Sequence, residues 1–260
     1  MNQFYAQFLK ATDVQKGDIL DIASDLLSVM LRFRERHEKF DANELLDALQ
    51  DAVGENGTIL IRTFNWDFCH GVPFHYRTTP SQVGSLGNVA LKRADFKRTK
   101  HALYSWCVWG KEQDYLTSID PEDSFGDGSI FSILEDKNAK LLIIGDTRGL
   151  PTTGLHRAEQ RAKIPVRYIK RFTGQYIDES GVCSEKTYSM FVRDLNYDFP
   201  HHDDWVVKKL LEKGALVQRQ HDGVNMMIVD LRKGSEGYYQ DILQGKFGEW
   251  TQCIKLNASE

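Results

Sequence analysis

The stretch KLLIIGDTRGLPTTGLHRAEQRA, residues 140–162, has the pattern of a buried strand, a turn and a helix in succession. Residues 140–145 are mostly aliphatic, as in a strand buried within a sheet. A turn with glycine, threonine and proline follows at residues 146–152, and a helix is predicted from about Thr153 to Ala162. Strands that alternate with helices in this way indicate an α/β fold.

The same alternation continues on the N-terminal side of this unit. Short apolar runs predict strands at residues 19–23, 58–64 and 105–109, and apolar residues at helical spacing predict helices at residues 41–53 and 127–135. A further helix is predicted at residues 79–93, because Thr79 suits the N-cap, Pro80 the first helical position and Gln82 the third position of a capping box.

After Pro165 the pattern becomes richer in strands. Two strand pairs are predicted, at residues 166–177 with 182–195 and at residues 215–220 with 224–231. Helices are predicted in this part at residues 202–214 and 237–243. We therefore expect one domain over residues 1–260, a three-layer α/β/α fold with a central mixed sheet and a β-rich C-terminal part from about residue 165.

The composition disfavours several classes of protein. Of the 260 residues, 41% are hydrophobic and 27% are charged, which is ordinary for a globular chain. The net charge of −4 disfavours nucleic acid as a partner, because phosphate binding needs a basic surface, and it suits a cationic substrate. No apolar run approaches the ~20 residues that span a bilayer, and the N-terminal residues have no signal-peptide core. We expect a cytoplasmic protein whose four cysteines are free thiols, with a homodimer left open.

The most informative polar residues are Thr153, His156 and Glu159. Residues three apart lie on the same side of a helix, so these three predict a polar stripe directly after a strand and a turn. Binding crevices of α/β sheets lie beyond the carboxyl ends of the strands. A histidine at that edge, oriented by a carboxylate, has what a general base needs. The plainer interpretation is a histidine that packs or caps, with its glutamate in water.

A second candidate segment is TFNWDFCHGVPFHYRTTPSQVGSL, residues 63–86. It is dense in aromatic residues, and it contains the predicted helix start at Thr79. The free N–H groups of a helix start suit an anion or the oxygen of a thioester. A well-packed surface loop is the plainer interpretation.

Other groups of residues are weaker candidates. His101 and Ser105 form either a hydrogen-bonded pair or, at least as readily, a structural histidine near a serine. The run from His201 to Asp204 has the residue types of a metal site, but its acidic pair suits the first turn of a helix, so we expect no metal. A basic cluster is either a solvated face or a phosphate site, and its members are Lys92, Arg93, Lys97, Arg98 and Lys100.

Taken in order, these segments resemble the aminoglycoside 3-N-acetyltransferase family, most clearly between residues 17 and 167. The strand segments GDILDIAS (17–24) and GTILIRTF (57–64) are similar to two family signatures. The next similarities are FCHGVPF (68–74), TPSQVG (79–84), HALYS (101–105) with Gly110, FGDGS (125–129) and the stretch from Thr153 to Glu159. A single similar segment would be weak evidence for the family, whereas this many segments in the same order make the resemblance specific.

The resemblance implies a non-GNAT α/β/α enzyme that transfers an acyl group from acetyl-CoA, or another acyl-CoA, to a primary amine. It implies His156 as the catalytic base, with Glu159 and Thr153 as the other catalytic residues. Contacts with coenzyme A are implied at Ser24, Thr63, Thr79, Ser81 and Ser105. The acceptor it implies is the 2-deoxystreptamine ring of an aminoglycoside, which links the family to antibiotic resistance. Relatives also acylate amino sugars for surface polysaccharides.

Two alternatives to an active His-dependent transferase remain. Asp25 and Ala102 stand where the family has a serine and a proline, and Arg62 replaces a further proline, so the first alternative is a coenzyme A-binding homologue without activity. The second is a hydrolase or acyltransferase that depends on Cys69 or Cys107.

The acceptor depends on the charge of its pocket. An aminoglycoside is a polycation and needs carboxylates, whereas a nucleotide-linked amino sugar is anionic and needs arginine or lysine. The last hundred residues contain both kinds of side chain, namely Asp178, Glu179, Asp194, Asp198, Asp203 and Asp204 against Arg167, Lys170, Arg171 and Arg193.

Overall fold

Three parallel strands form the centre of the main sheet in the computed structural model, which describes residues 3–146, 150–200 and 202–256. They are β6 (Lys140–Ile144), β1 (Ile19–Ser24) and β2 (Thr58–Arg62), with β1 in the middle. Leu20 of β1 is paired with Ile59 of β2 and with Lys140 of β6. Because the strands run in the same direction, their carboxyl ends meet at one edge of the sheet.

Antiparallel strands extend this sheet on both sides. β5 (Trp106–Gly110) pairs with β2, and β4 (Lys97–Arg98) pairs with β5. On the other side, β11 (Val224–Asp230) pairs with β6, and β10 (Leu216–His221) pairs with β11. The order within the described residues is β10-β11-β6-β1-β2-β5-β4. The prediction of a mixed sheet is therefore confirmed, and the predicted hairpin near residues 215–231 forms one edge of it.

Helices cover both faces of the sheet because successive strand residues point to opposite sides. In β6, Leu142 and Ile144 belong to a cluster with α1 (Gln3–Ala11), α2 (Leu27–Glu35), α3 (Ala42–Val53) and α4 (Ser85–Ala90). Leu141 and Ile143 pack on the opposite face with α7 (His156–Ala162), α8 (His202–Glu212) and α9 (Leu231–Leu243). This is the predicted α/β/α layering. No helix in the described ranges combines the length and the hydropathy needed to cross a bilayer.

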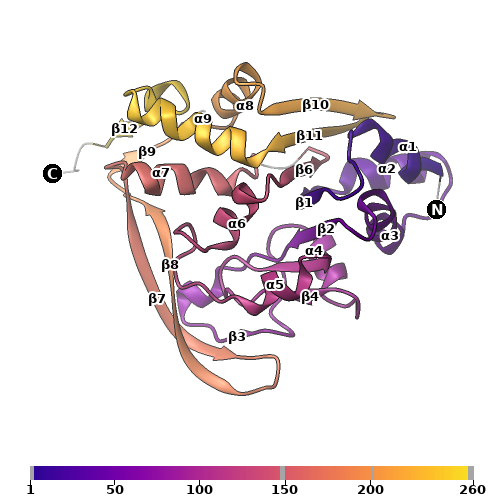
Figure 1. Ribbon diagram of the computed structural model, residues 1–260, viewed down its shortest axis with the longest axis horizontal. Helices are drawn as coiled ribbons and strands as arrows, with labels where there is room; N and C mark the ends of the chain where they lie inside the picture. The colour runs from indigo at the N-terminus through magenta and orange to yellow at the C-terminus, as the bar shows by residue number, and fades with distance from the viewer. Residues whose placement is uncertain (1–2, 147–149, 201, 257–260) are drawn as a thin grey trace.

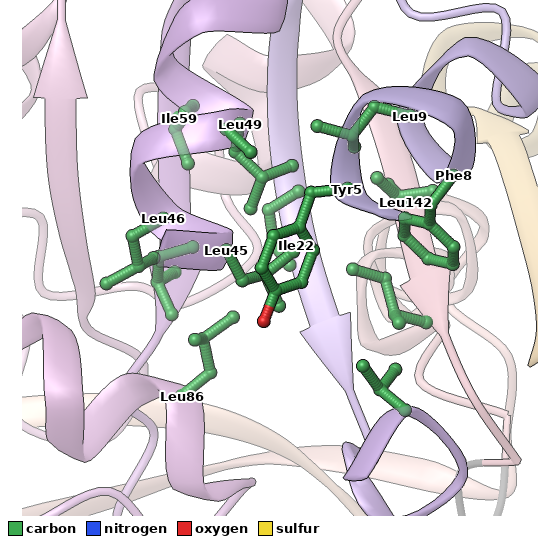
Figure 2. Close-up of a cluster of buried hydrophobic side chains, with 14 of the residues drawn as sticks. Tyr5, Phe8, Leu9, Ile22, Leu45, Leu46, Leu49, Ile59, Leu86 and Leu142 are labelled. Atoms are coloured by element: carbon green, nitrogen blue, oxygen red, sulfur yellow. The ribbon is translucent and has the colours of Figure 1, made fainter. Parts of the chain in front are cut away.

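Figure 2 shows how the first of these faces is filled. Side chains of α1, among them Tyr5, and of α3, among them Leu45 and Leu49, surround Ile22 of β1. Asp41 caps α3 by accepting a hydrogen bond from the backbone N–H of Asn43. The sequence prediction missed α1 and α2, although the apolar spacing within α1 buries one face of it completely.

A second sheet lies beside the main one. β7 (Arg167–Ile177) and β8 (Cys183–Arg193) form a long antiparallel hairpin, as predicted, and the short strand β3 (Phe74–His75) adds to β7. Figure 1 shows this hairpin extending along one side of the molecule and curving below it toward β3. The remaining elements are α5 (Gln113–Ser118), α6 (Ile130–Asp136), β9 (Tyr197–Asp198), β12 (Ile254–Lys255) and the 3-10 turns η1 (Asp67–His70), η2 (Thr153–Leu155) and η3 (Phe247–Glu249).

The prediction of a helix start at Thr79 is wrong. The helix begins at Ser85, and the Thr79 hydroxyl accepts a hydrogen bond from the backbone N–H of His75, which closes a loop instead of capping a helix. Gly84 precedes the helix with a φ of 108°. A Cβ at this position would lie 2.9 Å from the carbonyl oxygen of Ser24, so only glycine allows the loop to pass so close to the end of β1.

A buried ion pair stands at the carboxyl edge of the sheet. The side chains of Arg62 and Asp21 are 4% and 1% exposed, and their closest nitrogen and oxygen are 2.6 Å apart. The indole N–H of Trp106 donates to the same carboxylate at 3.0 Å. Arg62 also donates to the carbonyl oxygen of Pro151 at 2.5 Å. The pair therefore ties β1 and β2 to the segment that follows β6.

We predict that Asp21→Ala lowers the free energy of unfolding by about 3–5 kcal/mol, because it leaves the Arg62 guanidinium buried without its carboxylate. Urea unfolding measures this change. The matched control is Glu35→Ala, which removes the partner of Arg32 from an exposed ion pair and should cost less than about 1 kcal/mol. Equal effects of the two substitutions would contradict the importance of the buried pair.

Candidate active site

A cavity of about 530 Å³ opens at the carboxyl edge of the three parallel strands. Its wall comes from residues at the carboxyl ends of these strands and just after them: Ala23 to Leu26 at the end of β1, Arg62, Phe64 and Trp66 at the end of β2, and Leu150, Pro151 and Thr153 after β6. Residues 82–85 and Asp203 of α8 complete it. The volume lies within the range of small-molecule sites, about 300–1,000 Å³. The crevice is at the position expected for a sheet of this kind.

His156 and Glu159 are in direct contact beside this cavity. His156 is the first residue of α7, and its Nδ1 lies 2.7 Å from Oε2 of Glu159, one turn further along the helix. The imidazole edge also meets the ring of Phe125 at 5.6 Å between centroids. The side chain of His156 is 24% exposed, whereas that of Glu159 is 2% exposed. The carboxylate is therefore inside the protein and the imidazole at its surface.

Glu159 is ionised although it is buried. Burial alone would raise the pKa of its carboxyl group, but the charge and hydrogen bond of His156, together with Arg167 and Tyr238, hold this pKa at about 2. Tyr238 donates its hydroxyl to Oε1 at 2.9 Å, and Nε of Arg167 lies 2.9 Å from Oε2. An ionised carboxylate only accepts hydrogen bonds, so Nδ1 of His156 carries a proton. In the neutral imidazole, Nε2 then has the free lone pair.

His156 follows a residue of the cavity wall along the chain. Thr153, one turn before it, lines the cavity, while His156 itself stands just outside the lining. Within residues 3–146, 150–200 and 202–256, the structure gives Nε2 no hydrogen-bond partner. This arrangement can take a proton from a group that reaches past Thr153, which is the chemistry of a general base.

The sequence model of a family described as aminoglycoside 3-N-acetyltransferase matches residues 33–236. The chain belongs to this family. It is thus an acetyltransferase, and the predicted resemblance is confirmed. Among curated proteins, none gives a significant sequence match.

Solved structures of similar fold support this placement. Aminoglycoside acetyltransferase AAC(3)-Xa is 20% identical with a TM-score of 0.76, over 92% of this chain and 90% of that chain. AAC-IIIb, in a binary complex with CoASH, is 21% identical with a TM-score of 0.75, over 93% and 95% of the two chains. AAC-VIa bound to sisomicin is 18% identical with a TM-score of 0.75, over 93% and 96%. At these identities the likeness establishes the fold.

Of the five residues expected to contact coenzyme A, only Ser24 lines the cavity of the acetyltransferase. Thr63 and Ser105 are completely buried, and their hydroxyl oxygens lie 2.9 Å apart in a bond to each other. Thr79 lines a separate hollow. Ser81 is also buried, and its hydroxyl donates to the backbone carbonyl oxygen of Arg62 at 3.4 Å. Contacts of these four residues with coenzyme A stay a prediction. The burial of Thr63, Ser81 and Ser105 and the position of Thr79 disfavour such contacts.

His101 is a structural histidine in the acetyltransferase. Its Nδ1 accepts hydrogen bonds from the backbone N–H groups of Leu103 and Tyr104, both at 3.2 Å, and its Nε2 lies 3.2 Å from the hydroxyl of Ser124. Burial lowers the pKa of this imidazole to about 3. The alternative of a pair with Ser105 is therefore wrong, because both ring nitrogens bind elsewhere.

Neither candidate cysteine has the properties of a nucleophile. Burial raises the pKa of the Cys69 thiol to about 11 and that of the Cys107 thiol to about 12. Both are protonated at neutral pH, and only the thiolate is nucleophilic. The alternative of cysteine-dependent chemistry therefore lacks support in the structure.

Four members of the basic cluster at residues 92–100 bind other groups of the protein, among them Lys100, which donates to the backbone carbonyl oxygen of Ser118. Arg98 is buried and donates to Ser105 and to backbone carbonyls, Arg93 is paired with Asp47 and Asp95, and Lys97 with Asp114. None of the cluster lines the cavity. Of the proposed metal run, His201 lies outside the described residues, and the rest of the described chain holds no group of metal-binding side chains.

Two partners of Glu159 were not recognised from the sequence. Tyr238 lies 79 residues further along the chain, on α9, and no local pattern connects the two. Arg167 was considered only as a candidate for an anionic acceptor, but the structure commits it to Glu159. Asp203 is the one member of the expected acidic set that lines the cavity.

Proposed function

We propose that this acetyltransferase transfers the acetyl group of acetyl-CoA directly to a primary amine of an aminoglycoside, with His156 as the general base. The observation that carries the proposal is the contact of His156 Nδ1 with the ionised, buried Glu159 at 2.7 Å, which leaves Nε2 open beside a cavity. The family membership of the chain supports the same reaction.

The reaction needs a base because an amine is mostly protonated at neutral pH, with an unperturbed pKa near 10. Nε2 of His156 first takes one proton from the ammonium and releases it to solvent, so that the nitrogen has a free lone pair. Nε2 then accepts a second N–H proton as this lone pair attacks the thioester carbonyl. The carbon–sulfur bond then breaks, and the thiolate of coenzyme A takes up the proton from the imidazolium. Glu159 holds the ring in the tautomer that this transfer requires and stabilises the imidazolium. No acyl-enzyme is needed.

We assign the thioester to the cavity and the amine to the open side of His156. Thr153 places its side chain on the cavity wall, one turn before the base, and Ser24 lies at the end of β1 on the same wall. The Thr153 hydroxyl is the proposed donor to the thioester oxygen, a role in which one hydrogen bond is worth 10²–10³-fold in rate, as an order-of-magnitude figure. The complex of AAC-IIIb with CoASH supports coenzyme A as the carrier.

The charge of the cavity favours a cationic acceptor. Among the residues that the structure describes, the charged lining consists of Asp25, Asp203 and Arg62, and the charge of Arg62 is offset by Asp21. The net charge of this lining is therefore negative, which is the sign that the binding of a polycation requires. AAC-VIa, which binds sisomicin, has the same fold. The cations proposed for a nucleotide-linked amino sugar lie elsewhere, with Arg167 bound to Glu159 and Arg193 near Asp198.

The departures from the family pattern have structural roles that are compatible with activity. Asp25 accepts a hydrogen bond from the backbone N–H of Leu27 at 3.0 Å and so stabilises the start of α2. Ala102 is completely buried in the core. These roles do not favour the alternative of an inactive homologue. All four cysteines are free thiols, which supports our further proposal that the enzyme works in the cytoplasm.

We predict that His156→Ala lowers kcat/KM for acetyl transfer to sisomicin by about 10²–10⁴-fold, because it removes the general base. Release of free coenzyme A at saturating acetyl-CoA measures the rate. His75→Ala, which changes an exposed histidine outside the cavity, should keep the wild-type rate.

Calorimetric binding of coenzyme A shows whether the variant is folded. A wild-type rate for His156→Ala would remove this residue from the mechanism. Saturable binding of coenzyme A by the wild type, with no turnover of any aminoglycoside or amino sugar tested, would instead favour the inactive homologue.

Substitution of one cavity carboxylate tests the acceptor. We predict that Asp203→Asn raises the KM for sisomicin by roughly 3- to 10-fold, since it removes an attraction of about 1 kcal/mol for a cationic amine. Asp204→Asn, at the next residue of α8 but outside the cavity lining, should leave KM unchanged. A lower KM for a nucleotide-linked amino sugar in Asp203→Asn, with no change for sisomicin, would support the anionic acceptor.

A further inference from the structure

We propose that Arg167 and Tyr238 are positioning residues for the acetyl transfer. Both hold Glu159 in place. Arg167 also offsets the negative charge of Glu159, so that His156 takes up a proton less readily than it would beside a lone carboxylate. The inference rests on the proposed function, in which His156 must be free of a proton to act as a base. Neither residue lines the cavity, so both act through Glu159.

Side chains from three elements of the fold, α7, β7 and α9, contact the carboxylate of Glu159. Oε2 of Glu159 lies 2.7 Å from Nδ1 of His156 on α7 and 2.9 Å from Nε of Arg167 at the start of β7. Oε1 accepts the hydroxyl of Tyr238, on α9, at 2.9 Å. Glu159 is 2% and Arg167 14% exposed, so water screens these charges little. Figure 1 shows α7 and α9 packed against each other.

A histidine bound only to a buried carboxylate is readily protonated already at neutral pH, because the carboxylate stabilises the charged imidazole, and a protonated imidazole cannot accept the proton of an amine. Arg167 changes this balance, since its cation approaches the same oxygen that His156 uses. The cation compensates the negative charge of Glu159 and repels a second positive charge on the imidazole. Glu159 can then fix the tautomer of His156 without drawing it into a permanent ion pair.

Tyr238 provides the second restraint on Glu159. Burial, followed by the charge of Glu159, raises the pKa of the Tyr238 hydroxyl well above its ordinary value, so the group stays protonated and donates. This hydrogen bond occupies Oε1 and leaves Oε2 for the imidazole and the guanidinium. The carboxylate is held from two sides and cannot rotate away from His156.

Other charged groups around the dyad are engaged elsewhere. On α7, Arg157 is paired with Asp127 and Glu135, and Arg161 with Glu236 of α9. Asp241 of α9 is paired with Lys213, and Asp123, before α6, accepts from Gln160. Phe125 covers one edge of the imidazole and brings no charge. Asp203 of α8 lines the cavity and, in the described part of the chain, is not a partner of the dyad. Among the described residues, Arg167 is thus the cation placed to act on the dyad.

The β7–β8 hairpin offers a matched control for Arg167. Arg193 of β8 is the direct cross-strand partner of Arg167, and both guanidinium groups lie over the ring of Phe199. Arg193 is oriented toward Asp198, at 3.7 Å, and not toward Glu159. Arg193→Met therefore removes a cation from the same region of the sheet without touching the dyad.

The experiment is an NMR titration of the His156 imidazole in the substrate-free enzyme, together with the pH profile of kcat/KM. In Arg167→Met we expect the midpoint of the imidazole titration, and the acid limb of the profile, to move upward by about one pH unit or more. The rate at high pH should stay near that of the wild type, because the base is still present. Arg167→Lys, which keeps the charge, and Arg193→Met should both keep the wild-type midpoint.

A midpoint in Arg167→Met that is unchanged or lower would overturn the proposal, and so would a rate that falls equally at every pH. For Tyr238→Phe we expect a lower kcat at unchanged KM for acetyl-CoA, with thermal unfolding recorded alongside, and an unchanged kcat would remove Tyr238 from the proposal. Because the titration needs no turnover, its outcome is independent of the His156→Ala test of the proposed function. Should Arg167→Met fail to fold, Arg167→Gln serves for the same titration.

Discussion

The buried carboxylate of Glu159 is the constraint on which the arrangement of this site depends. A charge that is removed from water costs several kcal/mol unless other groups compensate it. Here the compensation comes from the helix that carries Glu159, from the first residue of β7 and from the middle of α9. The carboxylate is satisfied only when these three elements meet. The contact with His156, one of those that make its burial tolerable, also engages Nδ1 of the imidazole and leaves Nε2 for the proton transfer.

A second buried charge pair stands at the wall of the cavity. Asp21 lies in the central strand, and Arg62 at the end of the next strand reaches over to the backbone of Pro151. Arg62 thus holds the backbone at Pro151, a few residues before the helix that carries the catalytic dyad. Both pairs place a cation beside a carboxylate, so within residues 3–146, 150–200 and 202–256 the charge that remains on the cavity wall is that of Asp25 and Asp203.

Much of the fold follows from local patterns in the sequence. The central strands are continuous apolar runs, and the helix at residues 42–53 has an apolar stripe between a capping aspartate and a glycine. The contact of His156 with Glu159 could also be predicted, because residues three apart meet on a helix. These features depend on neighbours in the sequence.

The predictions that failed concern residues whose roles depend on contacts beyond their local sequence pattern. The signals at Thr79 were right for a helix start, but a contact with His75 uses the hydroxyl, and the loop must pass close to Ser24. Arg62 was noted only as a departure from a family pattern, because its partner Asp21 is 41 residues away. Arg167 and Tyr238 have no local signal at all. Motif residues such as Thr63 and Ser105 are completely buried, which a family pattern alone does not reveal.

A crystal structure of the enzyme with coenzyme A and sisomicin bound together would test the central claim most directly. The account predicts that one amino nitrogen of the aminoglycoside lies within hydrogen-bond distance of His156 Nε2, about 2.6–3.2 Å, or is joined to it by one water. The sulfur of coenzyme A should lie in the cavity beside Thr153. A sulfur bound elsewhere, or an acceptor whose amines all lie beyond the reach of His156, would contradict the account.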